Sequence, residues 1–318
     1  MATIYEVAKE ASVSPATVSR VLNGIRVRDD MAVRVLEASK RLGYSPNRTA
    51  RNLRMQSSEI IVLIVPDIEN PYFTSLARGV EDRAREAGYS VILCNSDEDV
   101  AKEADYLRIA LTQQTAGVII AHASAETDIG PLLTHKRLVV AVDRAPGSGD
   151  VDEVAVDNVA AGEIATRALL RNGYRRIACI TGPANVETAR DRAEGWRTIA
   201  GDRADELVHA DYRFAGGQQA MLAILDHGVA DAVVVANNVM GAGTLAALQA
   251  RGLQPKDFGI AVIGGLPFAP LWLGGVHVVE LPARELGLVA ARTLIERIAG
   301  LNDAPKRIIL PIPELDQP

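Results

Sequence analysis

The stretches TIYEVA at residues 3–8 and SPATVSRVLNG at residues 14–24 decide the character of the first part of the chain. Thr3 and Glu6 have the spacing of a capping box, which predicts that a helix begins there. Ser14 is a favourable N-cap, and Pro15 then takes the first helical position, where its missing N–H is not needed. Two short helices joined by a tight turn predict a helix-turn-helix, whose second helix enters the DNA major groove.

A third helix is expected from about Asp29 to Leu42, where Gly43 ends it. Helical spacing predicts an apolar face made of Met31, Val35, Leu36 and Leu42. The charge distribution agrees with a nucleic-acid-binding head. Residues 1–57 hold ten Lys or Arg against five Asp or Glu, a net charge of +5, and the remainder holds 24 against 35, a net charge of −11.

Length and composition bound the rest of the chain. At 318 residues, with 48% hydrophobic residues, the chain is too long for one ordinary domain. Neither a signal peptide nor an apolar run of membrane-spanning length is visible, so a cytoplasmic protein without membrane contact is expected. Cys94 and Cys179 lack metal-like spacing and are expected to be buried thiols.

From Ile60 onward, short apolar runs alternate with helical stretches. The expected strands are 60–65, 91–94, 118–121, 138–142, 177–180, 232–236, 260–263 and 308–310, and the expected helices are 72–87, 101–113, 159–172, 189–200, 216–226, 241–251 and 284–299. This alternation predicts an α/β fold with parallel sheets covered by helices. Two βαβ sets of similar size predict two doubly wound subdomains with a cleft at the C-terminal ends of the strands.

Catalytic patterns are missing from the sequence. The five histidines are scattered, and neither a Gly-x-Ser-x-Gly elbow nor a P-loop lysine motif occurs. Gly241-Ala242-Gly243 lacks the third glycine of a dinucleotide-binding turn and is better explained by close packing. We therefore expect a protein that is not an enzyme, with no cofactor and no metal ion.

The first 54 residues resemble the DNA-binding headpiece of the LacI/GalR family of bacterial regulators, apart from a shortened loop at residues 24–27. The rest resembles the periplasmic-binding-protein-like effector domain of that family. The matching segments are VPDIENPYF at 65–73, VDR at 142–144, VDN at 156–158, GP at 182–183, RDR at 190–192, GWR at 195–197 and VAN at 235–237.

The resemblance implies a division into three parts. Residues 1–46 form a helix-turn-helix headpiece, residues 47–58 a hinge helix and linker, and residues 59–318 an effector-binding and dimerisation domain. Within the last part, the subdomain break is expected near residue 157, and a helix near 284–300 is expected to cross back. The implied function is sequence-specific DNA binding by a transcriptional repressor that a small molecule controls through the cleft.

Individual DNA-binding roles follow on the matching positions. Pro15, Ala16 and Arg20 are expected to contact bases, since an arginine can bond guanine O6 and N7 together. Phosphate contacts are expected from Ser14, Thr17 and Asn23, beside Thr3 at the start of the first helix. The segment Asn47–Leu53, with Ala50, is expected to fold into a helix on a pseudo-palindromic DNA operator, with Leu53 as a minor-groove wedge.

Loops after the strands supply the effector candidates, which are Asn70, Tyr72, Phe73, Ala121, Asp143, Arg192, Tyr212 and Asn237. Phe73 and Tyr212 could stack on a ring, and Arg192 could bind oxygen atoms. An alternative role for Arg192 is an ion pair with Asp143 that holds the cleft together. Gly264-Gly265-Leu266-Pro267 lacks the family's usual carboxylates, so the sequence favours a less hydroxylated or anionic effector, or a cleft that binds none.

Three further expectations concern the assembly and its control. A homodimer is expected, and not a tetramer, because no heptad tail follows the strand at 308–310. An effector that changes the angle between subdomains would change the spacing of the two headpieces, although induction and co-repression remain open. The rival interpretations are a regulator without an effector or with a protein partner, and, from another class, a solute-binding protein.

Overall fold

The computed structural model describes residues 2–22, 25–44, 58–145, 150–255, 257–266 and 274–313. These residues belong to two compact units, Met1–Ser58 and Glu59–Pro318, which are described separately. The predicted DNA contacts Asn23, Asn47, Ala50 and Leu53, the expected helix at 47–53 and Pro267 lie outside the described residues. In the described part of the chain, no helix is long and apolar enough to span a membrane.

The headpiece contains α1 (Ile4–Glu10), α2 (Pro15–Leu22) and α3 (Asp29–Arg41). The predicted capping box is present, because Glu6 N–H donates to Thr3 Oγ1 at 3.4 Å and Thr3 N–H donates to Glu6 Oε2 at 2.7 Å. Ser14 Oγ accepts a hydrogen bond from Thr17 N–H at 3.1 Å and so caps α2. The core of the headpiece consists of Val7, Ala8, Ala11, Val18, Val35 and Ala38.

The predicted apolar face of α3 is partly wrong. Leu36 is 56% exposed and Leu42 is 38% exposed, whereas Val35, Ala38 and Ser39 are buried. One helical residue advances the side chain by about 100°, so Leu36 lies to the side of the stripe that contains Val35 and Ala38. Leu42 is the C-cap, where the helical repeat has ended.

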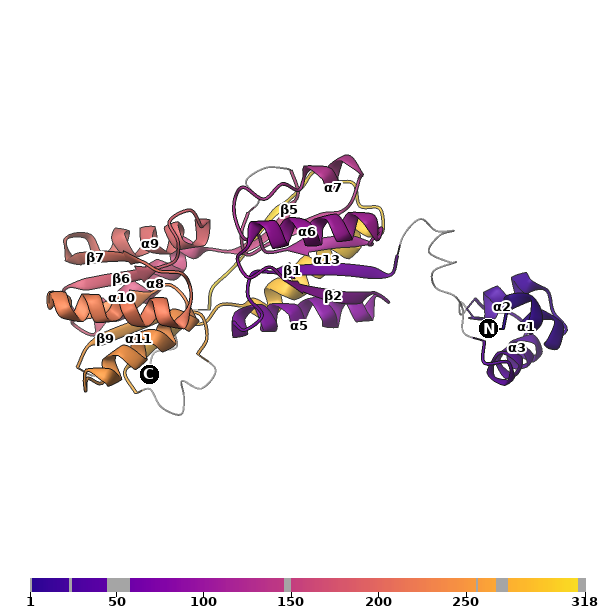
Figure 1. Ribbon diagram of the computed structural model, residues 1–318, viewed down its shortest axis with the longest axis horizontal. Coiled ribbons are helices and arrows are strands. Elements are labelled where there is room, and N and C mark those ends of the chain that lie inside the picture. Colours follow the sequence, from indigo (N-terminus) through magenta and orange to yellow (C-terminus); the bar gives the residue numbers. More distant parts are fainter. Residues whose placement is uncertain are drawn as a thin grey trace. The chain divides into compact units, whose positions relative to one another are not determined.

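The first sheet of the second unit is parallel and has the strand order β11-β5-β4-β3-β1-β2. Its strands are β1 (Ile60–Val65), β2 (Ser90–Asn95), β3 (Gly117–Ile120), β4 (Val139–Val142), β5 (Asp152–Val156) and β11 (Arg307–Leu310). Its helices are α5 (Pro71–Glu86), α6 (Val100–Thr112), α7 (Gly130–Thr134) and α13 (Ala283–Ile298). Figure 1 shows α5 and α6 lying on opposite sides of β1, which is the arrangement of a doubly wound fold.

The second sheet is also parallel, with the order β10-β9-β8-β6-β7. Its strands are β6 (Ile177–Thr181), β7 (Ala204–His209), β8 (Ala232–Val235), β9 (Gly259–Ile263) and β10 (Val276–Val279). Its helices are α8 (Asn158–Arg171), α9 (Glu187–Ala200), α10 (Phe214–His227) and α11 (Asn238–Ala250). The chain therefore leaves the first sheet at Asp157 and returns to it with α13, through Leu281 and Pro282.

Three strands were missed by the sequence prediction, namely β5, β7 and β10. In β5, Asp152 and Glu153 interrupt the apolar pattern, yet Asp152 is buried because it accepts two hydrogen bonds from Arg297, at 2.7 and 2.8 Å. β7 and β10 are edge strands with mostly half-buried residues. Apolar runs identify doubly covered strands far better than edge strands. Cys179 is buried as expected, but Cys94 is only partly buried.

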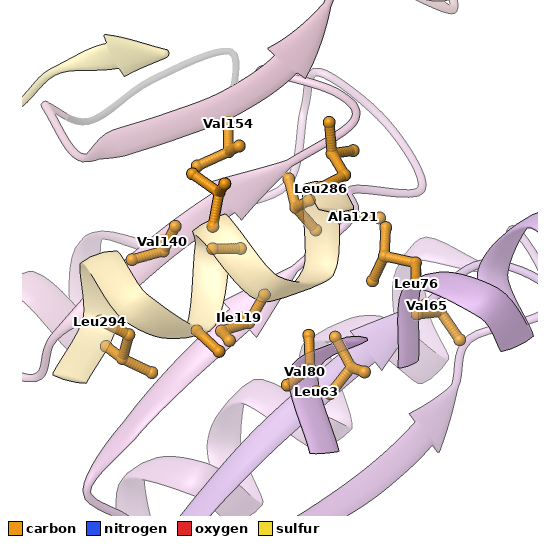
Figure 2. Packing of buried hydrophobic residues seen from close by; sticks show 14 of the residues in the cluster. Leu63, Val65, Leu76, Val80, Ile119, Ala121, Val140, Val154, Leu286 and Leu294 are labelled. Carbon is orange, nitrogen blue, oxygen red and sulfur yellow. The ribbon is translucent and has the colours of Figure 1, made fainter. Parts of the chain in front are cut away.

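The core of the first subdomain consists of branched aliphatic side chains that lie between the first sheet and the helices α5 and α13. Figure 2 shows Leu63, Val65, Ile119 and Val140 from the strands facing Leu76, Val80, Leu286 and Leu294 from the helices. Glycine lets these helices touch, because a Cβ at Gly79 would lie 2.1 Å from Arg284 O. Leu281 and Ile312 pack against the cores of both sheets, at the junction of the subdomains.

Candidate effector-binding cleft and DNA-binding headpiece

The loops that follow the parallel strands of the two sheets line one cleft. All seven residues of the predicted effector set, Asn70, Tyr72, Phe73, Asp143, Arg192, Tyr212 and Asn237, lie in this lining. The additional candidate Ala121 is fully buried and is not a lining residue. Asp67, Glu98, Arg144, Asp211, Arg213 and Asn238 also line the cleft, although the sequence analysis did not select them.

The first wall of the cleft belongs to the first sheet. Asn70 caps α5, because its Oδ1 accepts a hydrogen bond from Tyr72 N–H at 3.0 Å. This cap directs Tyr72 toward the loop after β4, where its hydroxyl donates to Asp143 Oδ1 at 2.6 Å. Burial and the charge of Asp143 raise the pKa of Tyr72 well above its ordinary value. Asp143 has φ = 68°, a strained backbone conformation that is enriched at functional sites.

Arg144 is the most heavily engaged side chain of this wall. Its two terminal nitrogens donate to Glu98 at 2.7 and 2.8 Å, and Nη1 also donates to His122 O at 3.0 Å. Its guanidinium lies 5.8 Å from the centre of the Tyr212 ring, across the cleft. Burial alone would lower the pKa of Arg144, but the hydrogen bonds and the charge of Glu98 raise it above its ordinary value.

The second wall is built around Arg192. Its Nε donates to Asn158 Oδ1 at 2.8 Å and its Nη1 donates to Ala236 O at 2.6 Å. The alternative ion pair with Asp143 is therefore not what fixes Arg192. The helix also begins at Glu187, two residues before its predicted start, so Arg192 lies in the second turn and not at the helix N-terminus.

Tyr212 and Asn237 complete the second wall. Asn237 caps α11 by accepting from Met240 N–H at 2.7 Å, and its Nδ2 donates to Tyr212 O at 3.4 Å. The Tyr212 hydroxyl lies 3.2 Å from Thr188 Oγ1, and burial raises its pKa. Tyr212 has φ = 62°, so both walls hold a strained non-glycine residue.

One ion pair joins the two walls directly. Arg213 Nη1 donates to Asp67 Oδ2 at 3.0 Å, from the loop before α10 to the loop after β1. The cleft is correspondingly narrow, with a cavity volume of about 40 Å³. This space holds little more than a water molecule. The structure therefore shows a nearly closed cleft that must open to admit an organic ligand.

A carboxylate stands close to the loop that lacks the family's usual ones. A Cβ added at Gly265 would lie 2.6 Å from Glu280 Oε2, so Glu280 occupies space that a side chain at position 265 would need. Glu280 follows β10, at the same C-terminal edge of the second sheet. Glu280 is exposed and is not a lining residue of the cleft, so the expectation that this loop lacks an effector acceptor stays a prediction.

The headpiece residues are placed as follows. Thr3, Ser14, Ala16 and Arg20 are exposed, and Pro15 and Thr17 are half-buried. The Ser14 and Thr17 hydroxyls lie 2.9 Å apart, which keeps both at the first turn of α2. Arg20 lies in the last turn of α2. Five of these six residues lie between Ser14 and Arg20, in α2 or directly before it, and Thr3 is the N-cap of α1.

Comparisons with known proteins agree with both units. Residues 3–47 match the family model "Bacterial regulatory proteins, lacI family", and residues 58–317 match "Periplasmic binding proteins and sugar binding domain of LacI family". The ribose operon repressor of Halalkalibacterium halodurans is 38% identical over 94% of this chain and 91% of that protein. The ribose operon repressor of Escherichia coli K12 is 34% identical, over 94% and 93%.

A solved structure agrees with these matches. A LacI family transcriptional regulator from Enterococcus faecium with bound ribose is 26% identical, with a TM-score of 0.72 over 80% of this chain and 96% of that chain.

Proposed function

The chain belongs to the LacI family of bacterial regulatory proteins, and from this premise we propose that its cleft binds a neutral pentose, with ribose as the first candidate. The chain is a DNA-binding transcriptional regulator with an effector-binding domain, and not an enzyme. The proposal concerns the effector, the residues that contact it, and the DNA-reading and dimer surfaces.

The charge balance of the cleft carries the choice of a neutral ligand. Its arginines already have acceptors, since Arg144 bonds Glu98, Arg192 bonds Asn158 and Ala236 O, and Arg213 bonds Asp67. An anion would have to displace these acceptors, and it would meet the nearby carboxylate of Asp143. Hydroxyl groups can donate to the carboxylates and accept from the arginines without adding charge.

The lining of the cleft favours a small sugar ring. Phe73, Tyr72 and Tyr212 offer flat apolar surface, and Asp143, Asn237 and Arg192 offer polar groups around it. This mixture of a few polar groups and aromatic rings is typical of small-molecule sites. The ribose operon repressors and the ribose-bound regulator provide the reason to test ribose before other pentoses.

Calorimetric titration of the full chain tests the proposal. Ribose is expected to bind and to raise the melting temperature, whereas ribose 5-phosphate is expected to bind at least about tenfold more weakly, a difference of about 1.4 kcal/mol. Tighter binding of ribose 5-phosphate would favour the anionic effector of the sequence analysis. A chain that responds to no sugar or sugar phosphate would support the alternative of a regulator controlled without a small molecule.

The DNA-reading surface is proposed on α2. Arg20, Ala16 and Pro15 contact bases, while Ser14, Thr17 and Thr3 contact phosphates; Asn23, Asn47, Ala50 and Leu53 keep the roles that the family resemblance implies. Replacement of Arg20 by Ala should remove discrimination at one position in each half-site, about 1–3 kcal/mol. Gel-shift titrations with single-base operator variants measure this, and unchanged discrimination would contradict the base contact.

The assembly is proposed to be a cytoplasmic homodimer on a pseudo-palindromic operator. At the free edge of the first sheet, β2 exposes two consecutive large apolar residues, Ile92 at 47% and Leu93 at 45%. Exposed apolar edge strands are potential association surfaces, which makes this edge a reasonable position for a second copy. Sedimentation of Leu93→Asp beside the parent tests it, with a shift toward monomer expected.

The domain boundaries are proposed as the sequence analysis placed them, at residues 46, 58 and 157. The hinge helix and linker at 47–58 remain part of this proposal.

A further inference from the structure

A second cavity shares Arg144 with the cleft as a lining residue. It has a volume of about 210 Å³, roughly five times that of the cleft as it stands. Its lining comes from the loop after β3, the loop after β4 and the start of α9, and includes His122, Ser124, Arg144, Asn185, Glu187 and Arg190. Apart from Arg144, these residues do not line the effector cleft, so the cavity is a separate place.

Unsatisfied buried polar groups gather at this cavity. Seven buried side-chain nitrogen or oxygen atoms in the described residues lack a hydrogen-bond partner, and three of them belong to His122 and Arg144. His122 is 1% exposed, and neither of its ring nitrogens is bonded. The nearest carboxylate oxygen, Glu103 Oε1, is 4.0 Å from Nδ1, and Glu103 is already bonded to Thr127 and to Ala123 N–H.

Such groups are costly when they remain unpaired. A buried donor or acceptor without a partner costs about 1–3 kcal/mol, and native proteins usually satisfy it with protein atoms, water or a ligand. Arg144 Nε faces the same situation, because its closest acceptor, Asp143 Oδ2, is 3.7 Å away. Both residues line the cavity and are more than nine-tenths buried, so a molecule bound there can supply the acceptors and the donor that they lack.

The charges around the cavity indicate the ligand class. Arg144 is paired with Glu98, and Glu187 lies 3.7 Å from Arg307. Arg190 is exposed and forms no ion pair within 4.0 Å in the described part of the chain, so its positive charge can act on the cavity as well as on the neighbouring carboxyl of Asp191. The α9 N-terminus adds to it, because its N-cap Val186 provides no side-chain hydrogen bond.

We propose that this cavity is a second ligand site, which binds a small monocarboxylate between His122, Arg144 Nε and Arg190. The carboxylate accepts from the two arginines and from the N–H of the neutral imidazole, and a hydroxyl or water beside it donates to the other ring nitrogen. Because Arg144 also touches Tyr212 across the cleft, occupancy of the second site changes the effector affinity, and the effector changes carboxylate affinity by the same factor.

The test uses acetate, lactate and pyruvate as probes, with lactamide as the uncharged analogue of lactate. Imidazole NMR signals of the full chain are recorded during each titration, and His122→Phe identifies the His122 signal. At least one carboxylate is expected to shift that signal saturably, and lactamide is expected to bind at least about tenfold more weakly than lactate. If no carboxylate shifts the His122 signal, or lactamide matches lactate, the proposal is wrong.

Matched charge variants provide the second arm. Arg190→Gln is expected to weaken carboxylate binding about tenfold. Arg171→Gln removes the same charge from the exposed C-terminal end of α8 and is expected to leave binding unchanged. Equal weakening by both variants would mean that the carboxylate responds to the overall charge of the protein and not to Arg190, and the proposed site would be wrong. Both positions are exposed, so folding is preserved, and ribose titration of the same variants keeps this outcome separate from that of the effector proposal.

Discussion

The two cavities that share Arg144 differ in how their polar groups are satisfied. In the cleft, charged groups are matched within and across the walls, as Asp67–Arg213 and the bonds of Arg192 show. In the second cavity, the His122 ring nitrogens and Arg144 Nε have no hydrogen-bond partner among the described residues, and Arg190 forms no ion pair within 4.0 Å there. A cavity whose polar groups already have partners can remain closed without a ligand. A cavity whose polar groups lack partners gains more free energy when a ligand supplies them. The two cavities therefore differ in the pairing of their polar groups, although both are lined by Arg144.

The largest effect is expected from the matched network of the cleft. Arg192→Ala should abolish effector binding at accessible concentrations and should also destabilise the free protein by about 2–4 kcal/mol, because Asn158 Oδ1 and Ala236 O lose their donor. Denaturant unfolding and sugar titration of the same variant separate the two roles, and Arg171→Ala serves as control.

A pH titration sharpens the contrast at His122. Burial and the charge of Arg144 lower its pKa from 6.5 to about 4. Between these two pH values the unfolded chain binds more protons at His122 than the folded chain does. The free energy of unfolding is therefore highest above pH 6.5 and decreases as the pH falls toward 4. The free energy of unfolding changes by about 3 kcal/mol over this pH range. His122→Phe should remove this part of the pH dependence, and parallel stability curves for variant and parent would refute it.

A substitution of Glu280 tests whether the carboxylate beside Gly265 contributes to effector binding. Glu280→Gln should weaken ribose binding by about tenfold, since a charged acceptor is replaced by a neutral one. Glu285→Gln, on the exposed start of α13, is the matched control. Calorimetry that gives equal affinities for both variants would remove Glu280 from the site.

The smallest effect is expected for the ion pair across the cleft. Asp67 and Arg213 are 12% and 37% exposed, so screening limits their coupling to about 0.5–1 kcal/mol. Arg213→Gln should accelerate ligand entry more than it changes stability, because it loosens the closed cleft. Stopped-flow binding of Asp67→Asn, Arg213→Gln and the double variant measures the coupling, which should vanish if the pair plays no part in closure.

Sequence reasoning was most successful where local rules dominate. The capping box at Thr3 and Glu6 and the strands at 60–65 and 260–263 follow from spacing and apolar runs, and the family matches support the interpretation of the whole chain. It failed where distant residues decide the outcome. β5 required Arg297 to bury Asp152, and the partners of Arg192 depended on where α8 begins and where β8 ends.

The second cavity illustrates the same limit. His122 and Arg144 come from two separate loops and Arg190 comes from α9, and no spacing in the sequence brings them together. A lone histidine after a strand is indistinguishable from many satisfied core histidines. Its unpaired nitrogens become visible only when every neighbouring donor and acceptor has been placed.

The two sheets also differ in how soon they can be completed during synthesis. Every strand and helix of the second sheet lies within residues 158–279, whereas the first sheet needs β11 and is covered by α13, which follow that segment. A ribosome must therefore release residue 310 before the first sheet can close, while the second can already be folded. Until then, β5 has no neighbour on one side, and Asp152 lacks Arg297. The nascent chain is thus most exposed to mispairing along β5.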